Sequence, residues 1–155
     1  PINFEDCAVR LSRPAIGITW ANQSVKLTHK GSAIVVTAKG TAPGKMTVSG
    51  VSYTLVQCHF HWLAEHTIGK YQYPLEFHCV HTKDDHDGRY GVFGLFYQVG
   101  ATADSFCNAF EDQLPTTSNS TSSFVGPLDF KTMYGSNPLT NYWSYEGSFT
   151  TPPCT

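Results

Sequence analysis

The sequence predicts a mainly β (α+β) fold, in which residues 1–155 form a single domain with a large sheet and a minor helical component. Three observations predict this class. Hydrophobic residues make up 41% of the chain, which is enough for a buried core and argues against disorder. Charged residues make up only 14%, whereas Gly, Pro, Ser and Thr are abundant, as in loop-rich β proteins. Alternating or β-branched apolar runs recur along the chain.

Four segments have the pattern of strands. Residues 33–37 are β-branched and apolar, and residues 53–62 and 75–82 alternate between apolar and polar side chains. Residues 90–99 form a nearly continuous apolar run, which predicts a strand that is buried on both faces.

One segment predicts a helix, which would begin after a capping Asp104 or Ser105 and end before Pro115. Its expected apolar face has a four-residue spacing and consists of Phe106, Phe110 and Leu114.

The composition excludes some functions. The formal net charge of −2 provides no basic surplus to hold a phosphate backbone, so we expect no nucleic-acid partner. No apolar run approaches the ~20 residues of a membrane span, so we expect no span in this segment. The chain begins at Pro1 without Met, as expected of a mature product or of a piece of a longer protein. The sequence carries no signal for the oligomeric state.

Glycosylation sequons and cysteines favour a secreted, extracellular protein. Asn22 and Asn119 each begin an Asn-x-Ser/Thr sequon. Asn119 lies in residues 116–123, which consist only of Thr, Ser and Asn and predict an exposed loop. The five cysteines are widely spaced and form no Cys-x-x-Cys motif, which fits long-range disulfides.

The sharpest signal for chemistry is the pair His59 and His61 in a predicted strand. Side chains alternate along a strand, so both imidazoles would lie on one face, about 7 Å apart along the strand axis. Such a pair can converge on one metal ion, whereas Cys58, Phe60 and Trp62 would lie on the opposite, apolar face.

A third ligand is expected from the next predicted strand. If the two strands pair antiparallel, His78 can meet His59 and His61. Three neutral imidazoles leave a fourth position open, which is the arrangement of a catalytic zinc site. The alternative is that these are ordinary core or surface histidines, since a His-x-His pair also occurs by chance.

Three blocks of the sequence resemble the signatures of the α-carbonic anhydrase family. They comprise residues 57–62, 65–67 and 76–81, then residues 142–154, and finally residues 1–3. The resemblance spans the whole chain. It implies a large, mostly antiparallel, twisted central sheet with few short helices, and a domain that is incomplete at its N- and C-terminus.

The resemblance implies a zinc lyase that reversibly hydrates carbon dioxide to bicarbonate and a proton. His59, His61 and His78 would bind Zn²⁺, and zinc-bound hydroxide would attack CO₂. Thr150 would accept a hydrogen bond from this hydroxide and donate its own to Glu65, which positions the nucleophile.

Further residue roles follow from the same resemblance. The backbone N–H of Thr150 and the side chain of Thr151 would border the substrate or bicarbonate. Val80, Val92 and Phe149 would line an apolar slot for CO₂.

Two polar residues would orient the ligands. Gln57 and Glu76 each precede a ligand histidine by two residues and so lie on its strand face, where they would fix its tautomer and ring angle. The alternative is an ordinary solvated polar residue. His66 and His81 match structural positions of the family and are kept out of the metal site.

The resemblance also bears on the cysteines. Cys7 and Cys154 fall where secreted members of the family carry a disulfide. Cys58 and Cys79 lie opposite the ligand face and are expected to be buried thiols, and Cys107 on the predicted helix is expected to be free.

The sequence departs from the family at the proton shuttle. Fast members carry a histidine where this chain has Ser32, which cannot relay protons near neutral pH as an imidazole does. His29, three residues earlier, is the candidate substitute. We therefore expect proton export to limit turnover.

Two other functions compete with CO₂ hydration. One is a carbonic anhydrase-like secreted binding, storage or matrix protein that is catalytically weak or inactive, and the other is a zinc hydrolase of esters. Relatives without catalysis usually lack ligand histidines, whereas all three are present here together with Glu65 and Thr150. The missing shuttle histidine keeps the binding or matrix function open.

Overall fold

The computed structural model describes residues 1–5, 14–39, 44–85, 87–122, 125–136 and 138–154. Most strands belong to one eight-stranded antiparallel sheet, in which β10, β9, β6, β4, β3 and β11 follow one another, β5 pairs with β6, and β2 pairs with β5. The bounds are β2 (Gly17–Ile18), β3 (Gln23–His29), β4 (Ile34–Ala38), β5 (Lys45–Val48), β6 (Val51–Trp62), β9 (Leu75–Lys83), β10 (Tyr90–Tyr97) and β11 (Val125–Leu128). The predicted mainly β class is confirmed.

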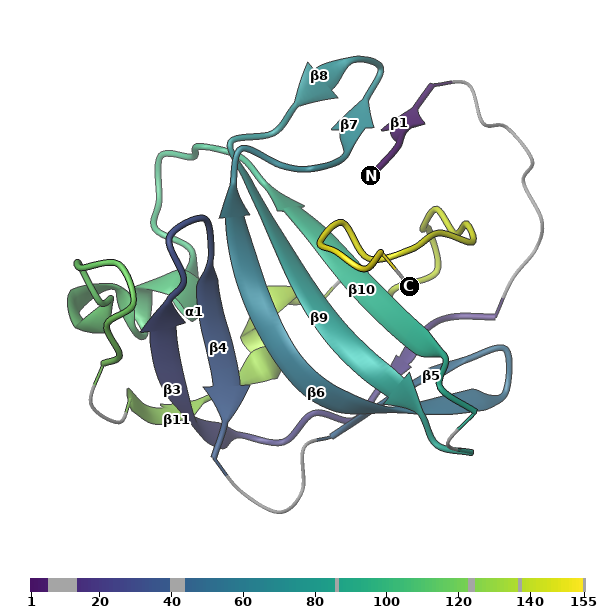
Figure 1. The fold of residues 1–155 in the computed structure, drawn as a ribbon, viewed down its shortest axis with the longest axis horizontal. Coiled ribbons are helices and arrows are strands. Elements are labelled where there is room, and N and C mark those ends of the chain that lie inside the picture. The colour runs from purple at the N-terminus through teal and green to yellow at the C-terminus, as the bar shows by residue number, and fades with distance from the viewer. Residues whose placement is uncertain (6–13, 40–43, 86, 123–124, 137, 155) are drawn as a thin grey trace.

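Smaller elements lie around this sheet. β1 (Asn3–Phe4), β7 (Thr67–Ile68) and β8 (Tyr71–Gln72) form a three-stranded sheet. The helices are α1 (Ser105–Asn108) and the 3₁₀ turns η1 (Glu111–Gln113) and η2 (Phe130–Met133). Figure 1 shows the curled main sheet with the C-terminal segment in yellow over β10. No helix in the described ranges is long and apolar enough to cross a membrane.

The strand predictions hold except for the burial of the last one. Residues 33–37, 53–62 and 75–82 fall on β4, β6 and β9, and residues 90–99 contain β10. The prediction that this last strand is buried on both faces is wrong, because Tyr90 is 49% exposed and Val92 is 50% exposed. Only the face with Phe93 packs into the core.

The predicted helix is much shorter than its pattern suggests. Asp104 caps α1, since its Oδ1 accepts a hydrogen bond of 2.9 Å from the backbone N–H of Cys107. At Phe110 the backbone leaves the helical region (φ −139°) and continues as η1. Phe106 and Phe110 are buried as predicted, but Leu114 is 40% exposed, because the turn at Phe110 breaks the four-residue spacing.

The core lies on one face of the main sheet. Val25, Leu27, Val36, Phe77 and Phe93 project from the strands, and the short helices and the segment before β3 cover them. The covering side chains are Trp20, Phe106, Phe110, Phe130 and Met133. Because strand side chains alternate, the opposite face is available for a functional site.

A β-bulge sets which side chains of β6 reach the core. Leu55 pairs with His81 and Gln57 with Val80, so Val56 is an extra residue between two register pairs. Before the bulge the odd-numbered Leu55 is buried, and after it the even-numbered Cys58 and Phe60 are buried. The bulge therefore turns the odd-numbered residues from 57 onward towards the other face.

The cysteines differ in part from expectation. Cys58 and Cys79 are buried as predicted, but they are not thiols, because they form a disulfide. The cause is the register, which places them directly opposite each other with Cα atoms 4.1 Å apart. Cys107 is free as predicted. Cys154 is exposed, while Cys7 lies outside the described residues, so their disulfide stays a prediction.

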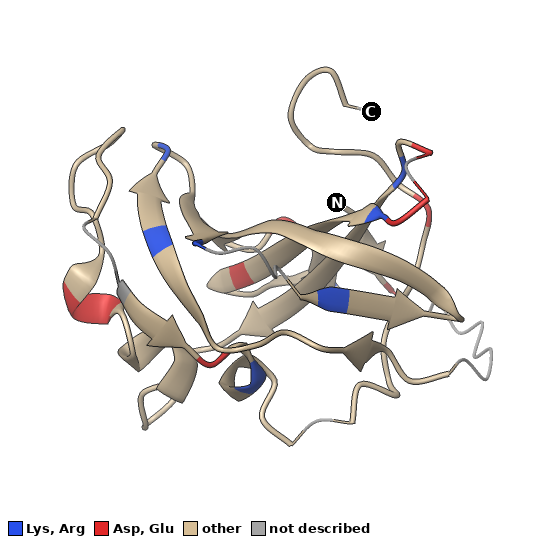
Figure 2. Ribbon diagram, turned by 90° about the horizontal axis from the view of Figure 1, so that it is seen from below, with Lys and Arg blue, Asp and Glu red and all other residues tan. Residues whose placement is uncertain are grey.

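The predicted polar loop is exposed over residues 116–119. It is attached to the sheet edge, since Thr28 bridges to Thr121. The asparagines of both sequons, Asn22 and Asn119, are exposed, so an attached glycan would not disturb the core. Glycosylation itself stays a prediction. Figure 2 shows Lys and Arg of the described ranges spread over several elements.

His81 is a fully buried histidine in the core. Its ring stacks on Trp20 with ring centroids 5.5 Å apart, and its Nδ1 donates a hydrogen bond of 3.2 Å to the carbonyl of Gly91. Burial lowers the pKa of His81 from 6.5 to about 4. The folded state therefore keeps this ring neutral near neutral pH.

Acid is expected to destabilise the fold through His81. The unfolded chain binds this proton near pH 6.5 and the folded chain only near pH 4, so the stabilisation is full above pH 6.5 and is lost as the pH falls. The loss in the free energy of unfolding from this group is about 2 kcal/mol at pH 5. Urea unfolding at pH 7.5 and pH 5 measures it. His81→Phe keeps an aromatic ring that cannot titrate, and an equal loss in this variant would contradict the assignment.

Candidate metal centre

Three histidines converge on the sheet face opposite the core. In the ladder between β6 and β9, His59 lies directly opposite His78, and His61 follows two residues along β6 on the same face. One ring nitrogen from each of the three lies within 4.8 Å of the others. The ring centroids are 4.8 Å apart for His59 and His61, 5.3 Å for His59 and His78, and 5.0 Å for His61 and His78.

The protonation of His59 and His61 and the unpaired nitrogen of His61 fit the binding of a metal ion. Burial, and then repulsion from His78 and His61, lowers the pKa of His59 to about 4, and burial also lowers the pKa of His61. Both imidazoles are therefore neutral near pH 7, the form that binds metal. The Nε2 of His61 is buried without a hydrogen-bond partner in the described part of the chain. Two neutral imidazoles, a third histidine beside them and a buried, unpaired ring nitrogen match the donor set of a zinc site.

Polar side chains surround the three rings. Gln57 Oε1 lies 3.1 Å from Nδ1 of His59. Glu76 Oε1 lies 2.8 Å from Nε2 of His78, although the ring N–H does not point along this contact. The structure thus places both expected orienting residues beside their histidines. Glu65 Oε2 lies 3.7 Å from Nε2 of His61, just beyond hydrogen-bond distance.

Glu76 also binds a fourth histidine. It is only 2% exposed, and its carboxylate accepts hydrogen bonds from the backbone N–H of His66 (3.0 Å) and from Nδ1 of the same residue (2.7 Å). Burial alone would raise the pKa of Glu76, but the contacts with His66 and His78 hold it well below its usual range. The group is therefore a carboxylate shared by two histidines.

Sequence reasoning missed one member of this network, Tyr145. The Nε2 of His66 lies 2.6 Å from its hydroxyl, and Phe4 stacks on His66 with ring centroids 5.6 Å apart. Phe4 also stacks on Trp143, at 5.1 Å. The signal was the position of Tyr145 within residues 142–154, one of the blocks that carry the family resemblance. These contacts attach the C-terminal segment to the face that carries the three histidines.

The structure does not bring Thr150 to Glu65. Thr150 and Thr151 are exposed, and no hydrogen bond joins Thr150 to Glu65 in the described ranges. Residues 140–154 form no strand, and side-chain contacts such as that between Phe149 and Tyr90, with ring centroids 4.7 Å apart, hold the segment against β10. The expected role of Thr150 stays a prediction.

The expected apolar slot is partly assembled. Val80 and Val92 lie opposite each other in the ladder between β9 and β10, on the same face as His78. Val80 is buried, Val92 is half exposed, and Phe149 is half buried beside Tyr90. Val80 and Val92 therefore provide apolar surface on the face that carries His78.

Neither candidate for proton relay reaches the histidine face by register. Ser32 is exposed in the turn after β3. His29 pairs with Ile34, which pairs with Phe60, so His29 lies on the core side of the sheet. Its Nδ1 accepts a hydrogen bond of 3.0 Å from the backbone N–H of Gly31. The role of His29 as a relay therefore has no support from the geometry.

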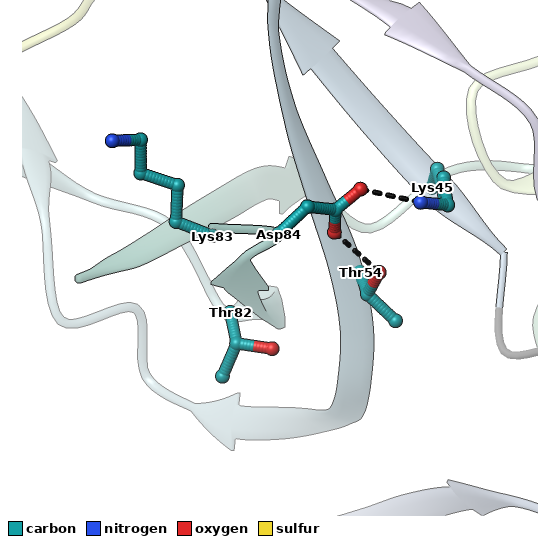
Figure 3. A pocket seen from close by; sticks show the side chains of 5 residues that line it. All are labelled: Lys45, Thr54, Thr82, Lys83 and Asp84. Carbon is teal, nitrogen blue, oxygen red and sulfur yellow. Dashed lines mark hydrogen bonds and ion pairs between the residues drawn. The ribbon is translucent and has the colours of Figure 1, made fainter. Parts of the chain in front are cut away.

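A surface hollow of about 310 Å³ lies at the far end of the same strands (Figure 3). Its lining includes Asp84, which forms an ion pair with Lys45 and accepts a hydrogen bond of 2.5 Å from Thr54. The hydrogen bond from Lys45, and then that from Thr54, lowers the pKa of Asp84 to about 2. Asp84, Lys45 and Thr54 therefore use their polar groups on one another. These contacts connect β5 and β6 to the turn after β9.

Comparisons with known proteins identify the family and agree with the fold. The family model for eukaryotic-type carbonic anhydrase matches residues 1–155. Alpha carbonic anhydrase 4 of Arabidopsis thaliana is 35% identical over 129 residues, which cover 83% of this chain and 46% of the relative. Alpha carbonic anhydrase 6 of the same plant is 33% identical over 158 residues, which cover 100% of this chain and 57% of the relative. The chain thus spans about half the length of the curated relatives it matches.

The similar proteins also include dioscorins and solved structures. Dioscorin dioA3 of Dioscorea japonica is 32% identical over 132 residues, which cover 84% of this chain and 46% of the relative. Among solved structures, the α-carbonic anhydrase of Thermovibrio ammonificans, in complex with the inhibitor sulfanilamide, has a TM-score of 0.88 and 28% identity, covering all of this chain and 66% of that one. Dioscorin complexed with ascorbate has a TM-score of 0.80 and 27% identity. The match covers 100% of this chain and 64% of that one.

Proposed function

Because the chain belongs to the eukaryotic-type carbonic anhydrase family, we propose that it carries the zinc site of an enzyme that reversibly hydrates carbon dioxide to bicarbonate and a proton. The observation that supports this most is the convergence of three imidazoles on one sheet face, with ring nitrogens within 4.8 Å of one another. His59, His61 and His78 would hold the ion. Zinc held in this way would lower the pKa of a water molecule at its open position and so supply a nucleophile near neutral pH.

The surrounding side chains would position the reactants. Gln57 and Glu76 orient two of the ligand rings from the same face. Val80 and Val92 offer an apolar surface beside the histidines, which suits a substrate without charge such as CO₂. Glu65 would accept a hydrogen bond from the hydroxyl of Thr150, the role that the family resemblance gives to this pair.

A second candidate is a binding or storage protein with weak or no catalysis. It is favoured by the exposure of Thr150, which forms no hydrogen bond with Glu65 in the described ranges, and by the similarity to a dioscorin. Stopped-flow CO₂ hydration on the intact protein, with the zinc content of the same sample, decides between the two. We expect activity with about one zinc per chain, rising with imidazole buffer because neither Ser32 nor His29 replaces the shuttle histidine. Bound zinc without activity would favour the second candidate.

We also propose that the protein is secreted. The disulfide between Cys58 and Cys79 and the exposed asparagines Asn22 and Asn119 support an oxidising compartment in which glycosylation occurs.

A further inference from the structure

Cys58 and Cys79 connect the two strands that carry the histidine cluster. They lie opposite each other in the ladder between β6 and β9, and the adjacent pair is His59 opposite His78. The Cα atoms of the disulfide are 4.1 Å apart, which corresponds to a narrow antiparallel pair. Since narrow and wide pairs alternate, the adjacent histidines are expected to form a wide pair, and their ring nitrogens lie within 4.8 Å of one another.

The other neighbour of the histidine pair is also a tight contact. On the far side from the disulfide, Phe60 lies opposite Phe77 with ring centroids 4.2 Å apart, and both rings are buried. The backbone of His59 and His78 therefore lies between a covalent cross-link and an aromatic contact. Both anchors are on the core face, while the imidazoles project from the other.

We propose that the disulfide between Cys58 and Cys79 is a positioning element of the histidine site, so that zinc affinity depends on the oxidation state of this cysteine pair. This inference rests on the proposed metal site. Affinity of a multidentate site depends on how well its ligands are already held in the bound geometry. The cross-link limits the separation of β6 and β9 next to the ligands, whereas without it only ladder hydrogen bonds and packing do so.

The chemistry of the switch is a thiol–disulfide exchange. A dithiol reductant supplies two electrons and two protons, the sulfur–sulfur bond breaks, two cysteine thiols form, and the reductant becomes a disulfide. A small-molecule disulfide reverses the reaction. Cys58 and Cys79 are 1% and 0% exposed, so the reagent reaches them only after β6 and β9 open locally. No histidine is consumed in either direction.

The test measures zinc affinity of the intact protein by competition with a chelator. The samples are the oxidised protein, the protein reduced with a dithiol and held under reductant, and the Cys58→Val/Cys79→Val double variant, in which two apolar side chains fill the space without a bond. We expect reduction and the double substitution each to weaken zinc binding at least tenfold. Cys107→Ser, at a cysteine that is free in the structure, is the matched control and should leave the affinity unchanged.

Several results would overturn the inference. One is unchanged zinc affinity in the folded double variant or in the reduced protein, and if the variant does not fold, the reduced protein decides. Another is alkylation of Cys58 and Cys79 in unfolded, unreduced protein, as mapped by mass spectrometry, because the bond would then be absent. Zinc binding in neither redox state would overturn the metal site as well. Tight, redox-dependent zinc binding without CO₂ hydration supports the inference and overturns only the proposed activity.

Discussion

His78→Ala is expected to weaken zinc binding by about two orders of magnitude. Apparent zinc-binding free energies of four-ligand peptide sites are about 10–16 kcal/mol, which is roughly 3 kcal/mol for each ligand. The ring of His78 closes a nearly equilateral triangle with His59 and His61, since its centroid lies 5.3 and 5.0 Å from theirs and those two are 4.8 Å apart. Chelator competition on the purified variant measures the loss directly, without reference to catalysis.

A matched control is available on the same sheet. His29→Ala removes a half-buried histidine from the core side, opposite to the face of the cluster. Its zinc affinity should stay within twofold of the unaltered protein. If His78→Ala binds zinc as tightly as the unaltered protein, or if His29→Ala weakens it equally, the three-histidine site is wrong.

Glu76→Gln is expected to lower both the stability and the zinc affinity. The amide places an NH₂ group near donors of His66, so that at least one buried donor loses its acceptor, which costs about 1–3 kcal/mol. The ring of His78 also loses its carboxylate neighbour at 2.8 Å, and loss of such a partner weakens metal binding by about 10- to 100-fold. Urea unfolding of the metal-free protein gives the first effect, and chelator competition gives the second.

Glu111→Gln serves as the comparison for this pair of measurements. Glu111 is exposed in η1, on a different part of the chain, so the same chemical change should leave both quantities nearly unaltered. A metal-free Glu76→Gln protein as stable as the unaltered one would show that the carboxylate does not hold His66. Unchanged zinc affinity would remove its role beside His78.

The histidine cluster was predictable because it depends on local rules. Alternation along β6 puts His59 and His61 on one face regardless of the rest of the fold, and the short connection to β9 makes an antiparallel neighbour with His78 the simplest pairing. Gln57 and Glu76 follow from the same two-residue period. The family resemblance added the zinc chemistry, which strand geometry alone does not specify.

Features that depend on exact register were not predictable. The disulfide requires Cys58 to face Cys79 directly, and a shift of one residue in the ladder would have separated them. The early end of α1 depends on the turn at Phe110, which no residue in the helical pattern signals. The contact of Tyr145 with His66 joins residues 79 positions apart, and such a contact comes only from the tertiary fold.

The bulge at Val56 makes one residue matter through its presence and not through its side chain. Val56 is 48% exposed, so many side chains would be tolerated there. Its backbone, however, shifts the alternation of side chains along the strand by one residue. Leu55 therefore faces the core, while His59 and His61 face away from it. Along this stretch of β6, the side chain at position 56 can therefore vary. The number of residues between Leu55 and His59, however, is constrained.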